Sequence, residues 1–151
     1  MSDDLESKLD GLFSEKARRN AAAEQSRAEE EQLRREFADS FEQLIVTVIK
    51  PSIDRIAAYL VRHSIESIRT DKTENRNRII GVEFKRVGVQ HGSRAEVFYT
   101  ADSWSKKVVV RWCPHGLPNE GTWVNRDIDV ADITQESVTA KLMDVIDRQS
   151  F

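Results

Sequence analysis

Apolar side chains recur every three or four positions between Leu33 and Val61, the densest hydrophobic pattern in the chain. This spacing places them along one side of a helix. Pro51 removes a backbone donor and disfavours a helical conformation at Lys50, so the pattern predicts two helices joined by a kink, at residues 33–49 and 51–63. The residues of this stripe are Leu33, Phe37, Phe41, Leu44, Val48, Ile53, Ile56, Ala57 and Leu60.

Ile45, Val46 and Ile49 make the stripe wider than packing on one sheet requires. A helix with such a wide apolar surface is expected to bury two faces. The expected second surface is another copy of the same helix, so the sequence predicts a homodimer. The residues predicted to form the oligomerisation surface are Leu33, Phe37, Phe41, Leu44 and Val48.

Residues 1–32 are predicted to form an exposed N-terminal helical segment. Its middle, residues 14–32, contains alanine and charged side chains but no Val, Ile, Leu, Met, Phe, Trp or Tyr. A heptad frame that starts at Leu5 is still in phase at Phe37, yet the core positions between are almost all polar. The segment is therefore only partly coiled-coil-like.

The start of this segment, residues 3–13, carries an apolar face made of Leu5, Leu9, Leu12 and Phe13. A polar spacer separates this face from the next apolar residues, so it is not expected to be needed by the core. Two interpretations stay open. The face is either a docking helix for a groove on a protein partner or the end of a dimeric coiled coil.

The second half of the chain predicts a small sheet at about residues 65–130. Apolar and polar side chains alternate there in short runs separated by turn residues. The polar run DKTENRNR, residues 71–78, is predicted to be a loop, and Gln90-His91-Gly92-Ser93 a turn. A closing helix at 134–148 is capped by Asp132 or Thr134. The fold class is therefore α+β, with a four- to five-stranded antiparallel meander and helices on one face of it.

The composition suits a cytoplasmic protein. The 151 residues carry a formal net charge of −3, and the acidic N-terminal sequence lacks the apolar run of a signal peptide. Lys50, Pro51, Asp54 and Arg55 interrupt the longest apolar stretch, so no membrane span is expected. The single cysteine, Cys113, excludes an internal disulfide framework and a multi-cysteine zinc site.

Positive charge gathers in the predicted sheet, where residues 69–111 hold 10 Lys or Arg against 5 Asp or Glu. Cations beside aromatic side chains on a small sheet are typical of single-stranded nucleic-acid binding, which is the alternative function. The candidate contacts are Lys85, Arg86, Arg94, Lys106, Lys107 and Arg111. Trp104 lies within the turn sequence ADSWS, and Trp123 follows the turn sequence PHGLPNEG. Both are expected to be exposed, and exposed tryptophans favour contact with a protein partner.

Catalytic chemistry has little support. Cys113 and His115 are separated by a proline that prevents them from facing the same way along one strand. Asp127 and Asp129 share a strand face, where they are expected to be solvated. No phosphate-binding glycine loop is present, and the histidines are scattered singly. The sequence therefore predicts an interaction protein that is not an enzyme and needs no metal or cofactor.

Overall fold

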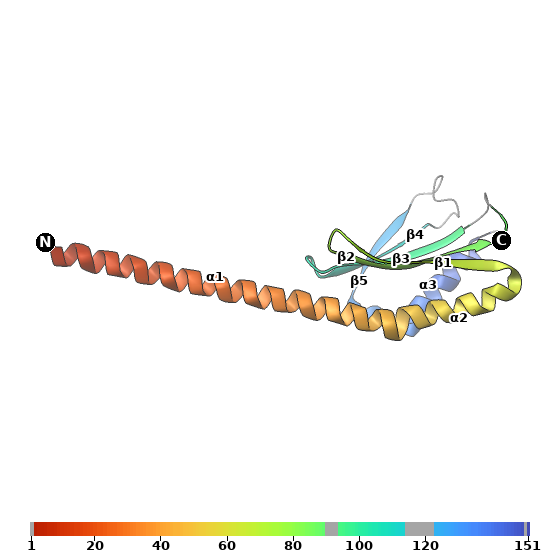
Figure 1. Ribbon diagram of the computed structural model, residues 1–151, viewed down its shortest axis with the longest axis horizontal. Helices are drawn as coiled ribbons and strands as arrows, with labels where there is room; N and C mark the ends of the chain where they lie inside the picture. Colours follow the sequence, from red (N-terminus) through yellow and green to blue (C-terminus); the bar gives the residue numbers. More distant parts are fainter. Residues whose placement is uncertain (1, 90–93, 114–122, 150) are drawn as a thin grey trace. The chain divides into compact units, whose positions relative to one another are not determined.

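The computed structural model describes residues 2–89, 94–113, 123–149 and 151 (Figure 1). The chain divides into two compact units, Met1–Glu36 and Phe37–Phe151. The predicted boundary was four residues earlier, at 32/33. The second unit holds a five-stranded antiparallel sheet, with helices before and after it. The predicted α+β class is confirmed.

The first helix, α1, runs from Ser2 to Leu44 without interruption. Its polar part carries the acid-first pairs that the sequence contains, among them Glu15 with Arg19 at 3.2 Å and Glu30 with Arg34 at 3.5 Å. Exposed pairs of this kind stabilise a helix by about 0.2–0.5 kcal/mol each. The helical conformation of residues 14–32 therefore rests on alanine propensity and local pairs, with little help from burial.

A π-helical turn, η1 (Ile45–Ile49), joins α1 to α2 (Lys50–Leu60), and the helix changes direction there (Figure 1). The Lys50 N–H donates to the Ile45 carbonyl five residues back. Pro51 has no N–H to donate, and the wider turn adapts the chain to this missing bond. The Ser52 hydroxyl donates to the Val48 carbonyl at 2.7 Å, which explains why Ser52 is a buried polar residue. The break predicted at Pro51 is thus a bend that begins six residues earlier, at Ile45.

After a 3₁₀ turn, η2 (Val61–His63), the five strands follow one another in a simple meander. Each strand pairs antiparallel with the next, in the order β1-β2-β3-β4-β5. Their bounds are β1 Ile65–Glu74, β2 Asn77–Arg86, β3 Arg94–Asp102, β4 Lys107–Trp112 and β5 Val124–Ile128. The predicted turn at 90–93 lies outside the described residues, as does the segment 114–122 before β5.

The loop predicted from Asp71 onward is wrong. β1 and β2 continue to a two-residue turn at Asn75 and Arg76, whose φ values of 50° and 68° are both positive, as a type I′ hairpin requires. The end of β1 is exposed and needs no apolar alternation. Ladder hydrogen bonds hold it, together with the ion pairs of Asp71 to Arg78 at 2.5 Å and to Lys50 at 2.8 Å.

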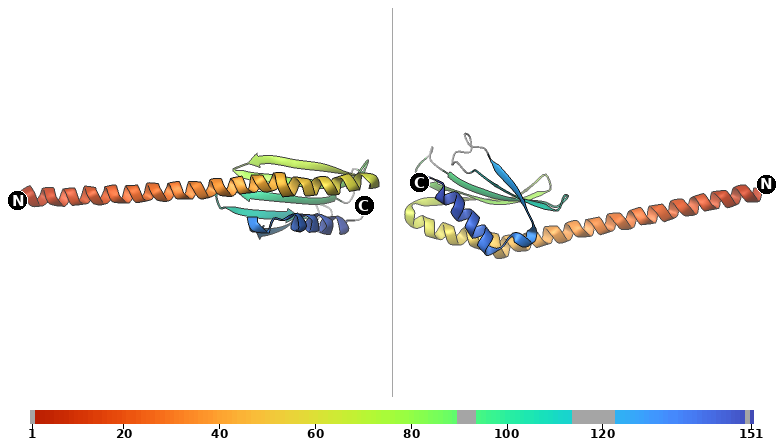
Figure 2. Two further views of the ribbon diagram at one scale, coloured as in Figure 1. Left: turned by 90° about the horizontal axis from the view of Figure 1, so that it is seen from below. Right: turned by 180° about the vertical axis from the view of Figure 1, so that it is seen from behind.

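α2 and the last helix, α3 (Gln135–Asp147), lie side by side on one face of the sheet (Figure 2). Thr134 begins α3 with a reciprocal capping box, because its hydroxyl accepts from the Ser137 N–H at 3.1 Å and its own N–H donates to the Ser137 hydroxyl at 3.0 Å. Of the two predicted caps, Thr134 is the one used.

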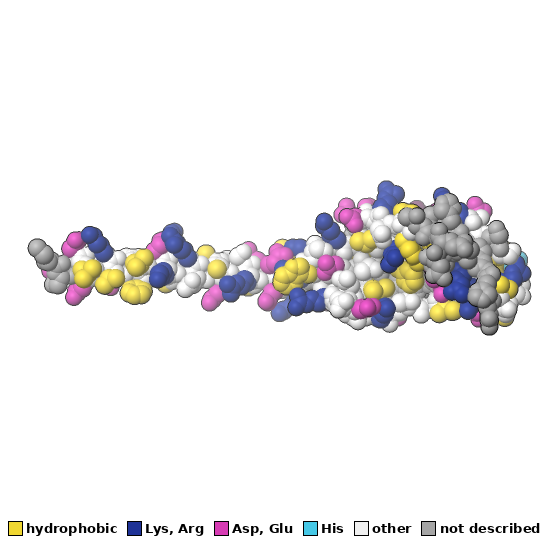
Figure 3. Space-filling model, turned by 90° about the horizontal axis from the view of Figure 1, so that it is seen from above, with side chains coloured by type: hydrophobic (Ala, Val, Ile, Leu, Met, Phe, Trp, Pro, Cys, Tyr) yellow, Lys and Arg dark blue, Asp and Glu magenta, His cyan; other side chains and the backbone are white. Residues whose placement is uncertain are grey.

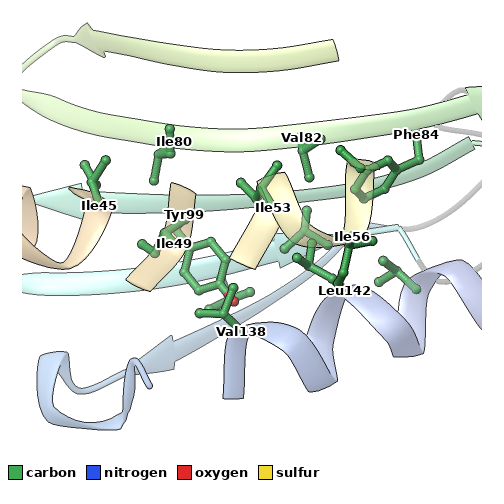
Figure 4. Close-up of a cluster of buried hydrophobic side chains, with 14 of the residues drawn as sticks. Ile45, Ile49, Ile53, Ile56, Ile80, Val82, Phe84, Tyr99, Val138 and Leu142 are labelled. Carbon is green, nitrogen blue, oxygen red and sulfur yellow. The ribbon is translucent and has the colours of Figure 1, made fainter. Parts of the chain in front are cut away.

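The core is a single layer between this face of the sheet and the helices (Figure 4). Ile49, Ile53 and Ile56 point from the helix toward Ile80 and Val82 of β2. α2 also packs against α3, and α3 packs against η1. Most of the wide apolar stripe of residues 41–60 therefore buries two faces within one chain, and the second partner is α3. Val46 is the exception, since it is 66% exposed. The width of the stripe no longer requires a second copy of the protein.

Candidate functional site

The N-terminal apolar face lies on the first unit. Leu5, Leu9, Leu12 and Phe13 are 61%, 43%, 50% and 62% exposed. None of the described residues from 3 to 36 is buried, so this unit has no core in which these side chains take part. Apolar side chains gather at this end of α1 in Figure 3. The sequence predicted these four residues as a partner-binding face, and that role stays a prediction.

The predicted oligomerisation residues fall into three classes of exposure. Phe41 is 0% exposed in the core of its own chain, so it has no surface to offer a second copy. Phe37, Leu44 and Val48 are half-buried and pack against the same core. Leu33, on the first unit, is 49% exposed. Self-association stays a prediction. Phe41 would affect it only indirectly, by stabilising the fold of its own chain.

The six candidate nucleic-acid contacts are distributed over different surroundings. Lys85 pairs with Glu66 at 3.5 Å, and Arg94 pairs with Glu83 at 3.1 Å. Arg111 lies 4.4 Å from the ring centroid of Trp123. The other three are Arg86 and Lys107, which are exposed, and Lys106, which is half-buried. They do not form one cluster of free cations.

The strand register identifies the charged side chains that lie on the sheet face turned away from α2 and α3. We call it the open face, and Figure 3 views the molecule from this side, where side chains of both signs are mixed. By alternation, five cations stand on it against six carboxylates. The cations are Lys72, Lys85, Arg94, Lys107 and Arg111, and the carboxylates are Glu66, Glu74, Glu83, Glu96, Asp102 and Asp127. Such a balanced surface is a poor match for a phosphate backbone.

Two tryptophans predicted as partner contacts each lie beside an arginine. Trp104 is 56% exposed in the β3–β4 turn, with the Arg76 guanidinium 5.3 Å from its ring centroid. Trp123 is half-buried on the open face, between Arg111 and the ring of Phe98, whose centroid is 6.1 Å away. The sequence predicted exposure for both, which is confirmed for Trp104 but not for Trp123, because Phe98 and Arg111 lie against its ring. It did not predict these cation–π pairs, which depend on neighbouring strands.

The open face also contains two carboxyl groups directly opposite each other, Glu83 on β2 and Glu96 on β3. Glu96 is only 8% exposed. Burial raises the pKa of Glu96, and the negative charge of Glu83 raises it further. Sequence reasoning missed this pair, because the β2–β3 register brings together residues thirteen positions apart.

A cavity of about 510 Å³ opens between α3 and the β4–β5 end of the sheet, on the helix side. Its wall includes Tyr99, Trp112 and Arg126 from three strands, and Ser137 and Lys141 from α3. The Lys141 ammonium lies 3.5 Å from the ring centroid of Trp112. Burial raises the pKa of the Tyr99 hydroxyl, which therefore stays protonated. No sequence signal pointed to this cavity, since side chains from three strands and from α3 form it.

The residues considered for catalysis are Cys113 with His115, and Asp127 with Asp129. Cys113 is 1% exposed, and Pro114 and His115 lie outside the described residues. Asp127 and Asp129 are exposed and line the cavity beside Asp132. Among the residues described, no three His, Cys, Asp or Glu side chains are grouped so that they could hold a metal ion.

Within the described ranges, no helix combines the length and the apolar character that crossing a membrane demands. Comparison of the chain with family models, with curated proteins and with solved structures finds no match. The functional proposal therefore depends on the surfaces described above.

Proposed function

We propose that this protein is a non-enzymatic, cytoplasmic interaction protein. It docks the apolar face of its N-terminal helix, Leu5, Leu9, Leu12 and Phe13, into a groove on a protein partner. The single observation that carries the proposal is the exposure of all four side chains, from 43% to 62%, on a unit without buried residues in its described part. Monomeric proteins seldom leave a contiguous apolar face of this kind in water.

The strength of such a contact can be worked out from these side chains. Full burial is worth about 1.5–3 kcal/mol for each side chain, and because these four are 43–62% exposed, docking gains roughly half of that, about 3–6 kcal/mol in total, before the cost of association is subtracted. That cost is itself about 4–15 kcal/mol. The face alone therefore supports weak, reversible binding, and tight binding needs a second contact. Trp104 on the sheet unit is the candidate, because it is 56% exposed and held beside Arg76.

The charge around the face indicates the kind of groove that fits it. Residues 1–13 contain four Asp or Glu and one Lys, so the segment carries a net charge of −3. Lys8 pairs with Asp4 at 3.3 Å, so the net negative charge of the segment comes from its other acidic side chains. A complementary groove is apolar at its centre and has Lys or Arg at its rim.

Self-association through the same face is the second form of the proposal. In a parallel pair, the two acidic segments would face each other and repel. A foreign partner with a basic rim is therefore favoured over a second copy. The nucleic-acid alternative has weaker support than the sequence suggested, because the open face carries six carboxylates against five cations.

The experiment compares two aspartate variants with the wild-type protein. Leu9→Asp places a charge in the centre of the apolar face. Ser7→Asp adds the same charge about half a helical turn away, on the opposite side of the same helix. Each protein is immobilised to capture partners from an extract of its native host, and its mass is measured by light scattering.

The proposal expects Leu9→Asp to lose a partner that Ser7→Asp and the wild type retain, with no change of mass. If Leu9→Asp lowers the mass of a wild-type oligomer, the face serves self-association instead. If both variants keep the same partner and mass as the wild type, docking through this face is wrong. If the wild type and both variants give a salt-dependent mobility shift of an oligonucleotide, nucleic-acid binding by the sheet would replace protein docking as the proposed function.

A further inference from the structure

The cavity between α3 and the β4–β5 end of the sheet combines an apolar wall with an unusual distribution of charge. Val110, Ile128 and Val130 form the apolar part, together with the rings of Tyr99 and Trp112. Its volume of about 510 Å³ is within the range of small-molecule sites, about 300–1,000 Å³. The cavity is therefore large enough for an organic molecule and has a surface suited to a partly apolar one.

The charges of the cavity differ between its interior and its rim. Asp127, Asp129 and Asp132 are exposed, so water screens them. Lys141 is half-buried, and its ammonium lies against the Trp112 ring at 3.5 Å. Because Coulomb interactions strengthen as water is excluded, the half-buried Lys141 attracts an anion more strongly than the exposed carboxylates repel it. Lys106, Lys107 and Arg126 add further positive charge to the lining.

The Lys141 ammonium forms no ion pair with a carboxylate of the described residues. Asp144, which lies one turn further along α3, pairs with Arg148 at 3.2 Å. Burial lowers the pKa of Lys141, and the positive charge of Arg126 adds to this effect while Asp144 opposes it. A cation that is desolvated and has a second cation nearby is stabilised by any anion that enters.

We propose that this cavity binds a small organic anion with an apolar body. The anionic group, a carboxylate or a group of similar charge, pairs with Lys141 and is reached by Arg126 from the edge strand β5. The body lies on Val110, Ile128 and Val130. This inference is independent of the docking function proposed for the N-terminal helix.

The test uses octanoate as the probe, with octan-1-ol and octylammonium as probes of the same body but different charge. Binding to the full chain is followed by the indole N–H resonances in a ¹H–¹⁵N spectrum. Trp112 lines the cavity, whereas Trp104 and Trp123 do not and serve as internal controls. The expected result is a saturable shift of Trp112 alone with octanoate, at least about tenfold tighter than with octan-1-ol.

Variants of the ammonium test the role of Lys141. Lys141→Gln should weaken octanoate binding about tenfold and leave octan-1-ol binding unchanged, and Lys141→Arg should restore much of the affinity for octanoate. Lys72→Gln is the matched control, because it removes the same charge from the β1–β2 hairpin, where Lys72 pairs with Glu74 at 2.8 Å.

Three results would overturn the proposal. Equal binding of octanoate and octan-1-ol would show that the cavity selects only the apolar body. Tighter binding of octylammonium would show that the rim carboxylates decide its preference. A Trp112 resonance that stays unshifted at millimolar octanoate, in a protein with the wild-type spectrum, would show that the cavity does not take such anions.

Discussion

Phe41 provides the sharpest test of how the long helix is used. The sequence placed it on an oligomerisation surface, whereas the structure buries it completely in the core of its own chain. Phe41→Ala removes most of a large, fully buried side chain from the core cluster. Truncations of this kind cost about 3–5 kcal/mol. For an urea m-value of about 2 kcal/mol/M, the unfolding midpoint should fall by roughly 1.5–2.5 M.

The assay is urea unfolding followed by tryptophan fluorescence, at two protein concentrations that differ twentyfold. Substitution of a residue that packs within one chain lowers the unfolding midpoint by the same amount at both protein concentrations. Substitution of a residue in a dimer interface lowers the midpoint by an amount that depends on the protein concentration. Phe41→Leu, which should cost about 1 kcal/mol, gives a folded comparison if the alanine variant is too unstable. A midpoint that does not change in Phe41→Ala while the mass halves would refute the intrachain packing of Phe41.

Three further substitutions test particular contacts by thermal unfolding. Gly81→Ala should destabilise by about 1–3 kcal/mol, because the new Cβ would clash with the Phe98 ring and stand 2.7 Å from the Val97 carbonyl oxygen; an unchanged melting temperature would contradict the strand geometry. Thr134→Ala should cost about 1 kcal/mol through loss of the α3 capping box, and Thr134→Ser should restore most of it. Since burial raises the pKa of Glu96 above 4.5, the folded state binds that proton more tightly than the unfolded state, and stability falls as the pH rises from about 4.5 through the folded-state pKa. Glu96→Gln should therefore raise the melting temperature more at pH 7 than at pH 4, and an equal effect at both would contradict this assignment.

Hydrophobic periodicity predicted most of the fold because burial decides which side of a helix or strand faces the core. The stripe at residues 41–60 and the alternation at Ile80, Val82 and Phe84 each follow the geometry of one element. The capping box at Thr134 is equally local, since its partner is three residues away. These features can be read from neighbouring residues.

The errors arose where structure depends on pairing between segments. The polar end of β1 has no alternation to reveal a strand, because its hairpin turn and its ladder to β2 hold it in place. The second partner of the wide helical stripe is α3, almost one hundred residues later in the chain. A sequence pattern shows that a face is apolar, but it does not show whether the same chain or another chain covers it.

The candidate sites likewise divide into those that depend on local sequence and those that depend on pairing between distant segments. Exposure of Leu5, Leu9, Leu12 and Phe13 followed from the polar spacer after them, which is a local feature. The cavity with Lys141 against Trp112 required the register of β4 and β5 and the placement of α3. The pairing of Arg111 with Trp123 depended on that register too.

The central claim is that the N-terminal apolar face is available to a partner because the α+β unit does not need it. Deletion of residues 2–13 tests this directly, with urea unfolding followed by the fluorescence of Trp104, Trp112 and Trp123, which all belong to the second unit. We predict that the free energy of unfolding of that unit changes by less than about 0.5 kcal/mol. A loss of about 1.5 kcal/mol or more, equivalent to exposing at least one buried leucine, would show that the segment completes the core and would contradict the claim.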